Sequence, residues 1–334
     1  MKIVVLAGGT STERDVSIVS GTGICQALRQ KGHQAILVDL FMGLENPPAD
    51  LNTLFDAPDG LCPDVKIEVQ APDLDVVRRS RPDQSPSRIG PHVLDICRLA
   101  DIVFLGLHGQ DGEDGRIQAA LDLLGVPYTG SGYLGSAIAM DKDLTKQLVA
   151  EKVTTPKWQT VTVTEENVDA LTAETQLPVV VKPIASGSSI GVFIAKTRQE
   201  LRHALTESIR LGGRTVLEQY IQGREIQVGI LAGKALPSIE IIPSDGFYDY
   251  ENKYKPGAVQ ETCPAPISEE LTKRLQEAAV DGYHALEMES YARLDFIVTE
   301  DEKIYCLEAN TLPGMTPTSL IPQEAAVLGM DYPT

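Results

Sequence analysis

Two segments near the end of the chain alternate between polar and apolar residues: Tyr291-Ala-Arg-Leu-Asp-Phe-Ile-Val298 and Lys303-Ile-Tyr-Cys-Leu-Glu-Ala-Asn310. Alternation with a period of two is typical of β-strands. The four residues between the segments, Thr299-Glu-Asp-Glu302, are all polar and indicate a turn. The stretch therefore predicts an antiparallel hairpin whose turn is centred on Asp301 and Glu302.

The register of this hairpin brings polar side chains together. Asp295 would face Glu308, and Arg293 would face Asn310, with all four side chains on one face. Facing carboxylates repel each other unless a cation joins them, and an all-oxygen set suits Mg²⁺ or Mn²⁺ rather than zinc. Polar faces with a paired arginine are also common on solvated antiparallel sheets. Spacing alone leaves both interpretations open.

Length and charge limit the classes of protein to consider. The chain has 334 residues, and a single hydrophobic core rarely supports a chain of this length. We therefore expect two or three packed units. A formal net charge of -18 opposes the phosphate-binding surfaces of nucleic-acid-binding proteins. No apolar stretch is long enough to span a bilayer, and the five cysteines are scattered, as in proteins with reduced thiols. We expect a soluble cytoplasmic protein with no nucleic-acid or membrane partner.

The chain begins with a strand–helix–strand pattern. The apolar run at residues 3–6 is broken by Gly8-Gly9-Thr10, and a second strand is expected at residues 35–40. Between them, Thr12-x-x-Asp15 resembles a capping box and predicts the start of a helix. The Gly8-Gly9-Thr10 turn lacks the fuller glycine fingerprint of dinucleotide-binding folds, which argues against a nicotinamide-dependent oxidoreductase.

A continuous apolar run at residues 101–107 is typical of a buried parallel strand. It leads directly into His108 and the loop at residues 110–115. Ligands of open α/β sheets bind at this end of the strands, so His108 is a candidate binding residue. A histidine in the core or at a helix cap would give the same pattern.

A second candidate region holds a lysine at a strand end and small residues. Lys182 precedes the loop at residues 183–191, whose glycines and serines could offer N–H groups to phosphate, although such loops also connect ordinary hairpins. Residues 246–257 mix aromatic residues with lysines and could form a lid or a plain surface loop. Glu218 and Glu225 could accept hydrogen bonds from a ribose, or could be solvated charges.

Taken together and in order, these stretches resemble the D-alanine:D-alanine ligase family over nearly the whole chain. Residues 41–91, which are rich in Pro and Asp, lie outside the resemblance and are expected to form an irregular insertion. The matching segments are LAGGTSTER at 6–14, LHGQDGEDG at 107–115, YTGSG at 128–132, MDK at 140–142, KPIASGSSIG at 182–191, FYDYENKY at 247–254, RLD at 293–295 and EANTLPGMT at 308–316.

The resemblance implies an ATP-grasp fold of mixed α/β and α+β class. An N-terminal domain with a doubly wound parallel sheet, residues 1–130, would be followed by two α+β domains that clamp ATP, residues 131–218 and 219–334. Members of the family continue beyond the point where this chain ends into a further helix, so a shortened last domain is expected. A homodimer is also expected.

The resemblance also assigns roles in binding ATP and two Mg²⁺ or Mn²⁺ ions. It implies that lysines and loop serines hold the phosphates, that one segment holds the adenine, and that one glutamate holds the ribose. The phosphate residues are Lys142, Lys182, Ser188, Ser189 and Lys253; the adenine residues are Glu218, Gln219, Tyr220 and Ile221; the ribose residue is Glu225; and the metal ligands are Asp295, Glu308 and Asn310.

The implied reaction joins two D-alanines through a D-alanyl phosphate, as a step in peptidoglycan precursor synthesis. The remaining implied roles concern these substrates and the transition state. Glu13 would bind the first ammonium group with His108 close by; Glu13, Ser188 and Tyr254 would share hydrogen bonds; Ser319 and Leu320 would meet the second carboxylate; and Arg293 with the Gly314 N–H would stabilise the oxyanion.

Three alternatives remain beside this function. Related ligases join D-alanine to D-lactate or D-serine, but the Lys253-Tyr254 pair resembles the dipeptide-forming type. A different ATP-grasp ligase is disfavoured by the presence of Glu13, His108 and Tyr254 in their motifs. A catalytically silent nucleotide-binding protein is disfavoured because every expected polar residue is present.

Overall fold

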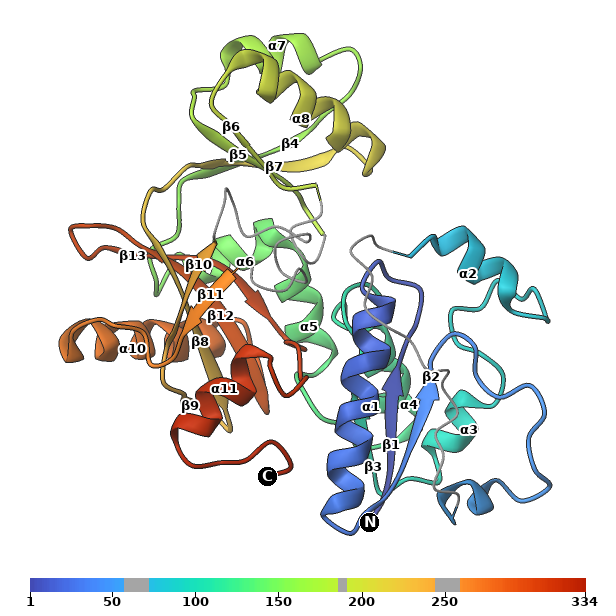
Figure 1. The fold of residues 1–334 in the computed structure, drawn as a ribbon. Helices are drawn as coiled ribbons and strands as arrows, with labels where there is room; N and C mark the ends of the chain where they lie inside the picture. The colour runs from blue at the N-terminus through green and yellow to red at the C-terminus, as the bar shows by residue number, and fades with distance from the viewer. Residues whose placement is uncertain (57–71, 186–190, 244–258) are drawn as a thin grey trace.

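The structure is a computed structural model that describes residues 1–56, 72–185, 191–243 and 259–334. These residues form one parallel sheet and two antiparallel sheets, each packed against helices (Figure 1). This combination confirms the predicted mixed α/β and α+β class. In the part of the chain that is described, no helix is both long and apolar enough to cross a membrane.

The N-terminal sheet is parallel, and its central strand lies between the other two in the order β2-β1-β3. Ile3 and Val5 pack against α1, whereas Val4 and Leu6 belong to a core with α3 and α4 on the opposite face. Helices thus cover both faces, which confirms the doubly wound arrangement. The elements are β1 (Lys2–Ala7), α1 (Arg14–Gln30), β2 (Gln34–Asp39), α3 (Val93–Cys97), β3 (Ile102–Leu105) and α4 (Arg116–Leu124).

The predicted capping box at the start of α1 is wrong. The N-cap is Glu13 rather than Thr12, and its side chain makes no capping hydrogen bond. The preceding turn is held instead by a buried ion pair between Arg14 and Asp39, and Arg14 Nη1 also donates to the Gly9 carbonyl at 2.7 Å. A β-carbon at Gly8 would lie 2.6 Å from the Asp39 carboxyl group, so this turn requires glycine.

Residues 41–91 contain two short described helices, η1 (Leu51–Asp56) and α2 (Leu74–Ser80). Asp73 caps α2 by accepting the backbone N–H groups of Asp75 and Val76. Residues 57–71 lie outside the described ranges.

The second sheet is antiparallel and lies at the top of Figure 1, in the order β4-β7-β5-β6. Two helices cover one of its faces through a core of valine, leucine and alanine side chains. The longer of them, α8, begins with a capping box between Thr197 and Glu200. The elements are β4 (Trp158–Thr162), α7 (Val168–Glu174), β5 (Val179–Pro183), β6 (Phe193–Ala195), α8 (Arg198–Arg210) and β7 (Arg214–Gln219).

The third sheet is also antiparallel, in the order β11-β10-β8-β12-β13, with β9 beside β8. One face packs against α10, α5 and α6 in a common core, and α11 contacts β8. The elements are α5 (Tyr133–Met140), α6 (Lys142–Val149), β8 (Arg224–Leu231), β9 (Lys234–Ala235), β10 (Ile239–Pro243), β11 (Val259–Thr262), α10 (Glu269–Ala285), β12 (Tyr291–Val298), β13 (Ile304–Asn310) and α11 (Leu320–Val327). The domain limits at residues 130 and 218 stay predictions, although α5 and α6 pack on this last sheet.

The predicted hairpin is present, with Asp295 opposite Glu308 and Arg293 opposite Asn310, but its turn is centred on Asp301 alone, because Thr299 N–H donates to the Lys303 carbonyl and Val298 pairs with Ile304. A feature that alternation does not predict lies beside these pairs. The register shifts between Asp295 and Phe296, so that Leu307 is an extra residue of β13. The extra residue changes which side chains of β13 point to the core. Cys306 and Ala309, three residues apart, both lie in the core, while Glu308 and Asn310 line the opposite face.

The register of β12 can be tested by truncating two neighbouring side chains. Phe296 is fully buried in the core, whereas Ile297 lies on the opposite face. We expect Phe296→Ala to lower the free energy of unfolding by about 3 to 5 kcal/mol, and Ile297→Ala to lower it clearly less. Urea denaturation measures both values. A larger loss for Ile297→Ala would mean that the strand faces are reversed.

Candidate active site

A cleft of about 700 Å³ is lined by side chains from the second and third sheets and from the segments that follow β1 and β3 of the first sheet. It lies along the face of the third sheet that does not pack on α10. Its walls include the turn before α1, the loop after β3, the ends of β5 and β7, and the start of α11.

Most of the residues that the sequence singles out line this one cleft. They come from the N-terminal part, the central part and the C-terminal part of the chain, although up to about 300 residues separate them in sequence. They are Glu13, His108, Lys142, Lys182, Glu218, Gln219, Tyr220, Ile221, Glu225, Arg293, Asp295, Glu308, Asn310, Gly314, Ser319 and Leu320. Four further candidates, Ser188, Ser189, Lys253 and Tyr254, lie outside the described residues, as does the whole candidate lid at residues 246–257.

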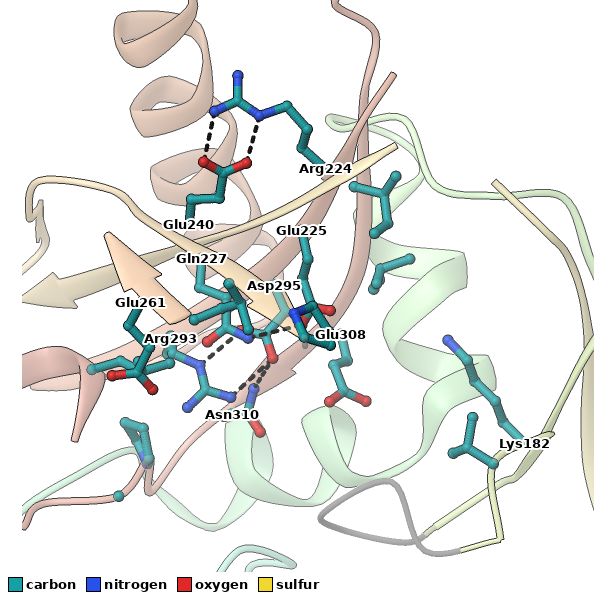
Figure 2. Close-up of a pocket in the computed structure, with 18 of the residues that line it drawn as sticks. Lys182, Arg224, Glu225, Gln227, Glu240, Glu261, Arg293, Asp295, Glu308 and Asn310 are labelled. Atoms are coloured by element: carbon teal, nitrogen blue, oxygen red, sulfur yellow. Dashed lines mark hydrogen bonds and ion pairs between the residues drawn. The ribbon is translucent and has the colours of Figure 1, made fainter. Parts of the chain in front are cut away.

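The hairpin contributes a connected polar patch (Figure 2). Arg293 binds the Asp295 carboxylate with two hydrogen bonds, from Nε at 2.7 Å and from Nη2 at 2.9 Å. Asn310 Nδ2 donates to Asp295 Oδ2 at 3.1 Å. Glu308 extends into the cleft, where its Oε2 lies 3.7 Å from Lys142 Nζ. The paired arginine of the alternative interpretation is therefore present, but this face lines a cleft and Asp295 is buried.

The patch has the donor atoms that a small divalent cation requires. Asp295, Glu308 and Asn310 offer side-chain oxygens from neighbouring positions on paired strands. Over the described ranges, no three or more His, Cys, Asp or Glu side chains cluster as ligands. A cation here would thus have two carboxylates and an amide, and water or phosphate oxygens would complete its shell. Mg²⁺ typically binds in this way, so the residues fit it.

Glu225 stands beside this patch on β8. Its Oε1 accepts a hydrogen bond of 3.1 Å from Gln227 Nε2. Burial, together with the negative charge of Asp295, raises the pKa of Glu225 to about 7. Carboxyl groups are therefore concentrated beside the hairpin patch, and a cation bound there would reduce the repulsion between them.

Lys182 and Glu218 form a buried ion pair at the opposite wall. Lys182 Nζ lies 2.8 Å from Glu218 Oε1, and a second lysine, Lys146, lies 2.5 Å from Oε2. Burial would raise the pKa of Glu218, but the two lysines outweigh it and hold the pKa below its ordinary value. Burial would lower the pKa of Lys182, but the charges of Glu218 and Glu308 raise it instead. Burial does lower the pKa of Lys146.

The N-terminal part supplies three polar side chains to the cleft: Glu13, His108 and Glu113. His108 has hydrogen-bonding contacts at both ring nitrogens, with the Leu312 carbonyl at 2.9 Å and Ser20 Oγ at 3.2 Å. Glu113 accepts the Leu312 N–H at 3.2 Å. These contacts tie the loop after β3 to the segment that follows β13, and so fix one end of the cleft.

The start of α11 also lines the cleft. Ser319 is the N-cap but makes no side-chain capping bond, because its Oγ accepts the Thr316 N–H at 2.9 Å instead. Gly314 lies against it, since a β-carbon there would be 3.0 Å from Ser319 Oγ. Backbone N–H groups at a helix N-terminus attract anions, so this end suits a carboxylate.

Two residues of the site carry no motif that singles them out in the sequence. Lys146 follows Lys142 by four residues, and this helical spacing, which places both lysines on one face of α6, is the only signal in the sequence that points to it. Glu113 is one of several acidic residues in the loop at residues 110–115. Nothing local in the sequence shows that it bridges Gly109, whose N–H lies 2.7 Å from Glu113 Oε2, and Leu312.

Comparisons with known proteins agree on one family. The family descriptions "D-ala D-ala ligase N-terminus" and "D-ala D-ala ligase C-terminus" match residues 2–131 and 148–334. The D-alanine–D-alanine ligase of Pediococcus pentosaceus is 40% identical over 334 residues, 99% of this chain and 94% of the relative. That of Lacticaseibacillus casei is 41% identical over 99% of this chain and 92% of the relative.

Two solved structures are similar over the full length. The D-alanine–D-alanine ligase from Bacillus anthracis complexed with ATP has a TM-score of 0.71 and 30% identity, and the match covers 100% of this chain and 94% of that one. The VanG D-Ala:D-Ser ligase from Enterococcus faecalis has a TM-score of 0.73 and 29% identity, and the match covers 99% and 96%.

The raised pKa of Glu225 predicts how stability depends on pH. The folded protein holds this proton more tightly than the unfolded chain, whose glutamates have an ordinary pKa near 4.5. The stabilisation is complete below pH 4.5 and is lost as pH rises to about 7, by at most about 3 kcal/mol.

Denaturation without added metal or nucleotide, at several pH values, measures this slope. Glu225→Gln should remove the part of the slope that lies between pH 4.5 and 7, whereas the exposed control Glu166→Gln should retain it. Equal slopes in wild type and Glu225→Gln would show that Glu225 titrates normally.

Proposed function

The chain belongs to the D-alanine–D-alanine ligase family, and from this we propose that it joins two D-alanines at the expense of ATP. ADP, phosphate and D-alanyl-D-alanine are the products, and the dipeptide enters peptidoglycan precursors. The observation that carries the proposal is the shared cleft. It gathers an oxygen-rich hairpin face, two lysines and a helix N-terminus within reach of one another.

The first chemical step activates a carboxylate. A carboxylate is a poor electrophile, so the γ-phosphoryl group of ATP is transferred to the first D-alanine to form an acyl phosphate. Lys142 and Lys182 would bind phosphate oxygens, while Glu218 to Ile221 would hold the adenine and Glu225 the ribose. Positioning and charge neutralisation supply most of the catalysis in such transfers.

Asp295, Glu308 and Asn310 would hold Mg²⁺ beside the phosphates. When bound, this ion neutralises charge on the phosphoryl group during transfer. Arg293 keeps the Asp295 carboxylate oriented through its two hydrogen bonds.

Glu13 would bind the ammonium group of the first D-alanine. Its carboxylate lies against Gly109, where a β-carbon would be 2.9 Å from Glu13 Oε2. His108 would lie beside this group in the orientation set by Ser20 and the Leu312 carbonyl.

The second step forms the peptide bond. The amine of the second D-alanine attacks the acyl carbon, and phosphate leaves. Arg293 and the Gly314 N–H would stabilise the tetrahedral oxyanion, a contribution worth about 3 to 4 kcal/mol per donor in other enzymes. Ser319 and Leu320 at the start of α11 would bind the second carboxylate.

Several finer features belong to the same proposal. Ser188, Ser189 and Lys253 would bind phosphate, and Ser188 and Tyr254 would share hydrogen bonds with Glu13. We also infer that the enzyme acts in the cytoplasm as a homodimer. D-lactate or D-serine as second substrate is the alternative, and the similarity to a D-Ala:D-Ser ligase keeps D-serine in the test.

The substrate assignment predicts a specific assay result. Phosphate release with ATP and Mg²⁺ should require D-alanine, and L-alanine should not replace it. Mass spectrometry of the product should show D-alanyl-D-alanine in excess when D-alanine competes with equal D-lactate or D-serine at neutral pH. A predominant mixed product would reassign the second substrate, and no phosphate release with any of them would refute the ligase activity.

The metal assignment predicts the effect of one neutral substitution. Glu308→Gln retains the size of the side chain but removes a charge from the proposed metal site, so kcat/KM at fixed Mg²⁺ should fall about 100-fold or more. The exposed Glu300, in the hairpin turn, provides the control Glu300→Gln, which should retain full activity. Unchanged kinetics in Glu308→Gln would remove Glu308 from the metal site.

A further inference from the structure

Lys146 is a buried charge that the proposed reaction does not use. It lies on α6, one turn after Lys142, and is only 1% exposed. Lys142 and Lys182 line the cleft, whereas Lys146 lies behind its wall. Lys146 therefore cannot contact a nucleotide directly, and its effect must pass through another group.

That group is Glu218. Its two carboxylate oxygens each face one ammonium group, Lys182 at 2.8 Å and Lys146 at 2.5 Å. Glu218 is only 1% exposed, and it lies on β7 between Trp158 and Val180 in the sheet register. One negative charge is thus buried between two positive charges, and only one of these reaches the cleft.

Lys146 is held in place from several sides. Its Nζ donates to Thr155 Oγ1 at 2.8 Å, and this hydroxyl donates to the Cys306 carbonyl of β13 at 2.9 Å. The ammonium group also lies 5.7 Å from the centre of the Trp158 ring on β4. The lysine is thereby fixed to both the second and the third sheet, on either side of the cleft.

A phosphate in the cleft would compete with Glu218 for Lys182. If Lys182 turned to the phosphate without a second lysine present, Glu218 would become a buried charge with no counter-ion, which is strongly unfavourable. Lys146 removes this obstacle, because Glu218 keeps one ammonium group while the other is released. Since burial alone would raise the pKa of Glu218 and the lysines hold it low, the carboxylate is charged.

We propose that Lys146 is a positioning residue for the triphosphate: it remains paired with Glu218 so that Lys182 can bind phosphate. This role rests on the proposed function, because it presupposes that a nucleotide occupies the cleft. Lys146 should therefore affect the affinity for the nucleotide and leave the affinity for D-alanine unchanged.

Lys146→Met tests this role by retaining the aliphatic stem and removing the charge. We expect the KM for ATP and the dissociation constant for ADP to rise about tenfold or more, while both KM values for D-alanine stay within twofold. The exposed Lys152, just after α6, provides the control Lys152→Met, which should match wild type. An unchanged KM for ATP, or an equal rise for ATP and D-alanine, would overturn the proposal.

A double variant covers the case in which Lys146→Met does not fold. Lys146→Met combined with Glu218→Gln removes one charge of each sign, so the net charge of the buried group is unchanged. If Lys146 acts through Glu218, the double variant should bind ADP within twofold of Glu218→Gln alone. Binding tenfold weaker than Glu218→Gln would show that Lys146 acts by another route and would overturn the proposal.

Calorimetry of ADP binding to the wild-type protein separates the two hypotheses. No binding by wild type at saturating Mg²⁺ would refute the proposed function itself. Binding by wild type that Lys146→Met leaves unchanged would refute only the role of Lys146.

Discussion

The register between β12 and β13 is the constraint on which the proposed site depends. It sets Asp295 opposite Glu308 and Arg293 opposite Asn310, and the bulge at Leu307 turns Glu308 and Asn310 to the cleft while Cys306 and Ala309 stay in the core. Without the extra residue, Glu308 would share a face with Cys306 and be driven into an apolar core, where an unpaired carboxylate is costly. The extra residue Leu307 thus allows β13 to place apolar side chains in the core and polar side chains in the cleft.

The cleft also shows how a strongly acidic chain can bind a polyphosphate. A formal net charge of -18 repels anions at long range, so positive charge has to be concentrated locally. Lys142 lies near Glu308, and Lys182 is paired with Glu218. Lysines that already have carboxylate partners are positioned without repelling each other, and in the proposed enzyme a bound phosphate would replace those partners. The affinity for the nucleotide then depends on whether Glu218 keeps an ion pair with Lys146 after Lys182 has turned to the phosphate.

Much of this arrangement could be predicted from local patterns. Alternation and a polar turn were enough for the pairs across the hairpin, and an apolar run was enough to place His108 at the end of a parallel strand. The bulge could not be predicted, because an extra residue leaves the apolar content of β13 unchanged. The start of α1 was misplaced because a distant residue, Asp39, holds the turn through Arg14. The raised pKa of Glu225 likewise depends on burial and on Asp295, which are set only by the tertiary fold.

In the proposed enzyme, the side-chain oxygens of Asp295, Glu308 and Asn310 hold a divalent cation beside the nucleotide. Anomalous diffraction from crystals grown with Mn²⁺ and a non-hydrolysable ATP analogue tests this assignment most directly, because the signal locates the metal independently of any model of the protein. We expect anomalous peaks within coordination distance of these three side chains and of the phosphate oxygens. Peaks bound only to other residues, with these three side chains free of metal, would contradict the assignment.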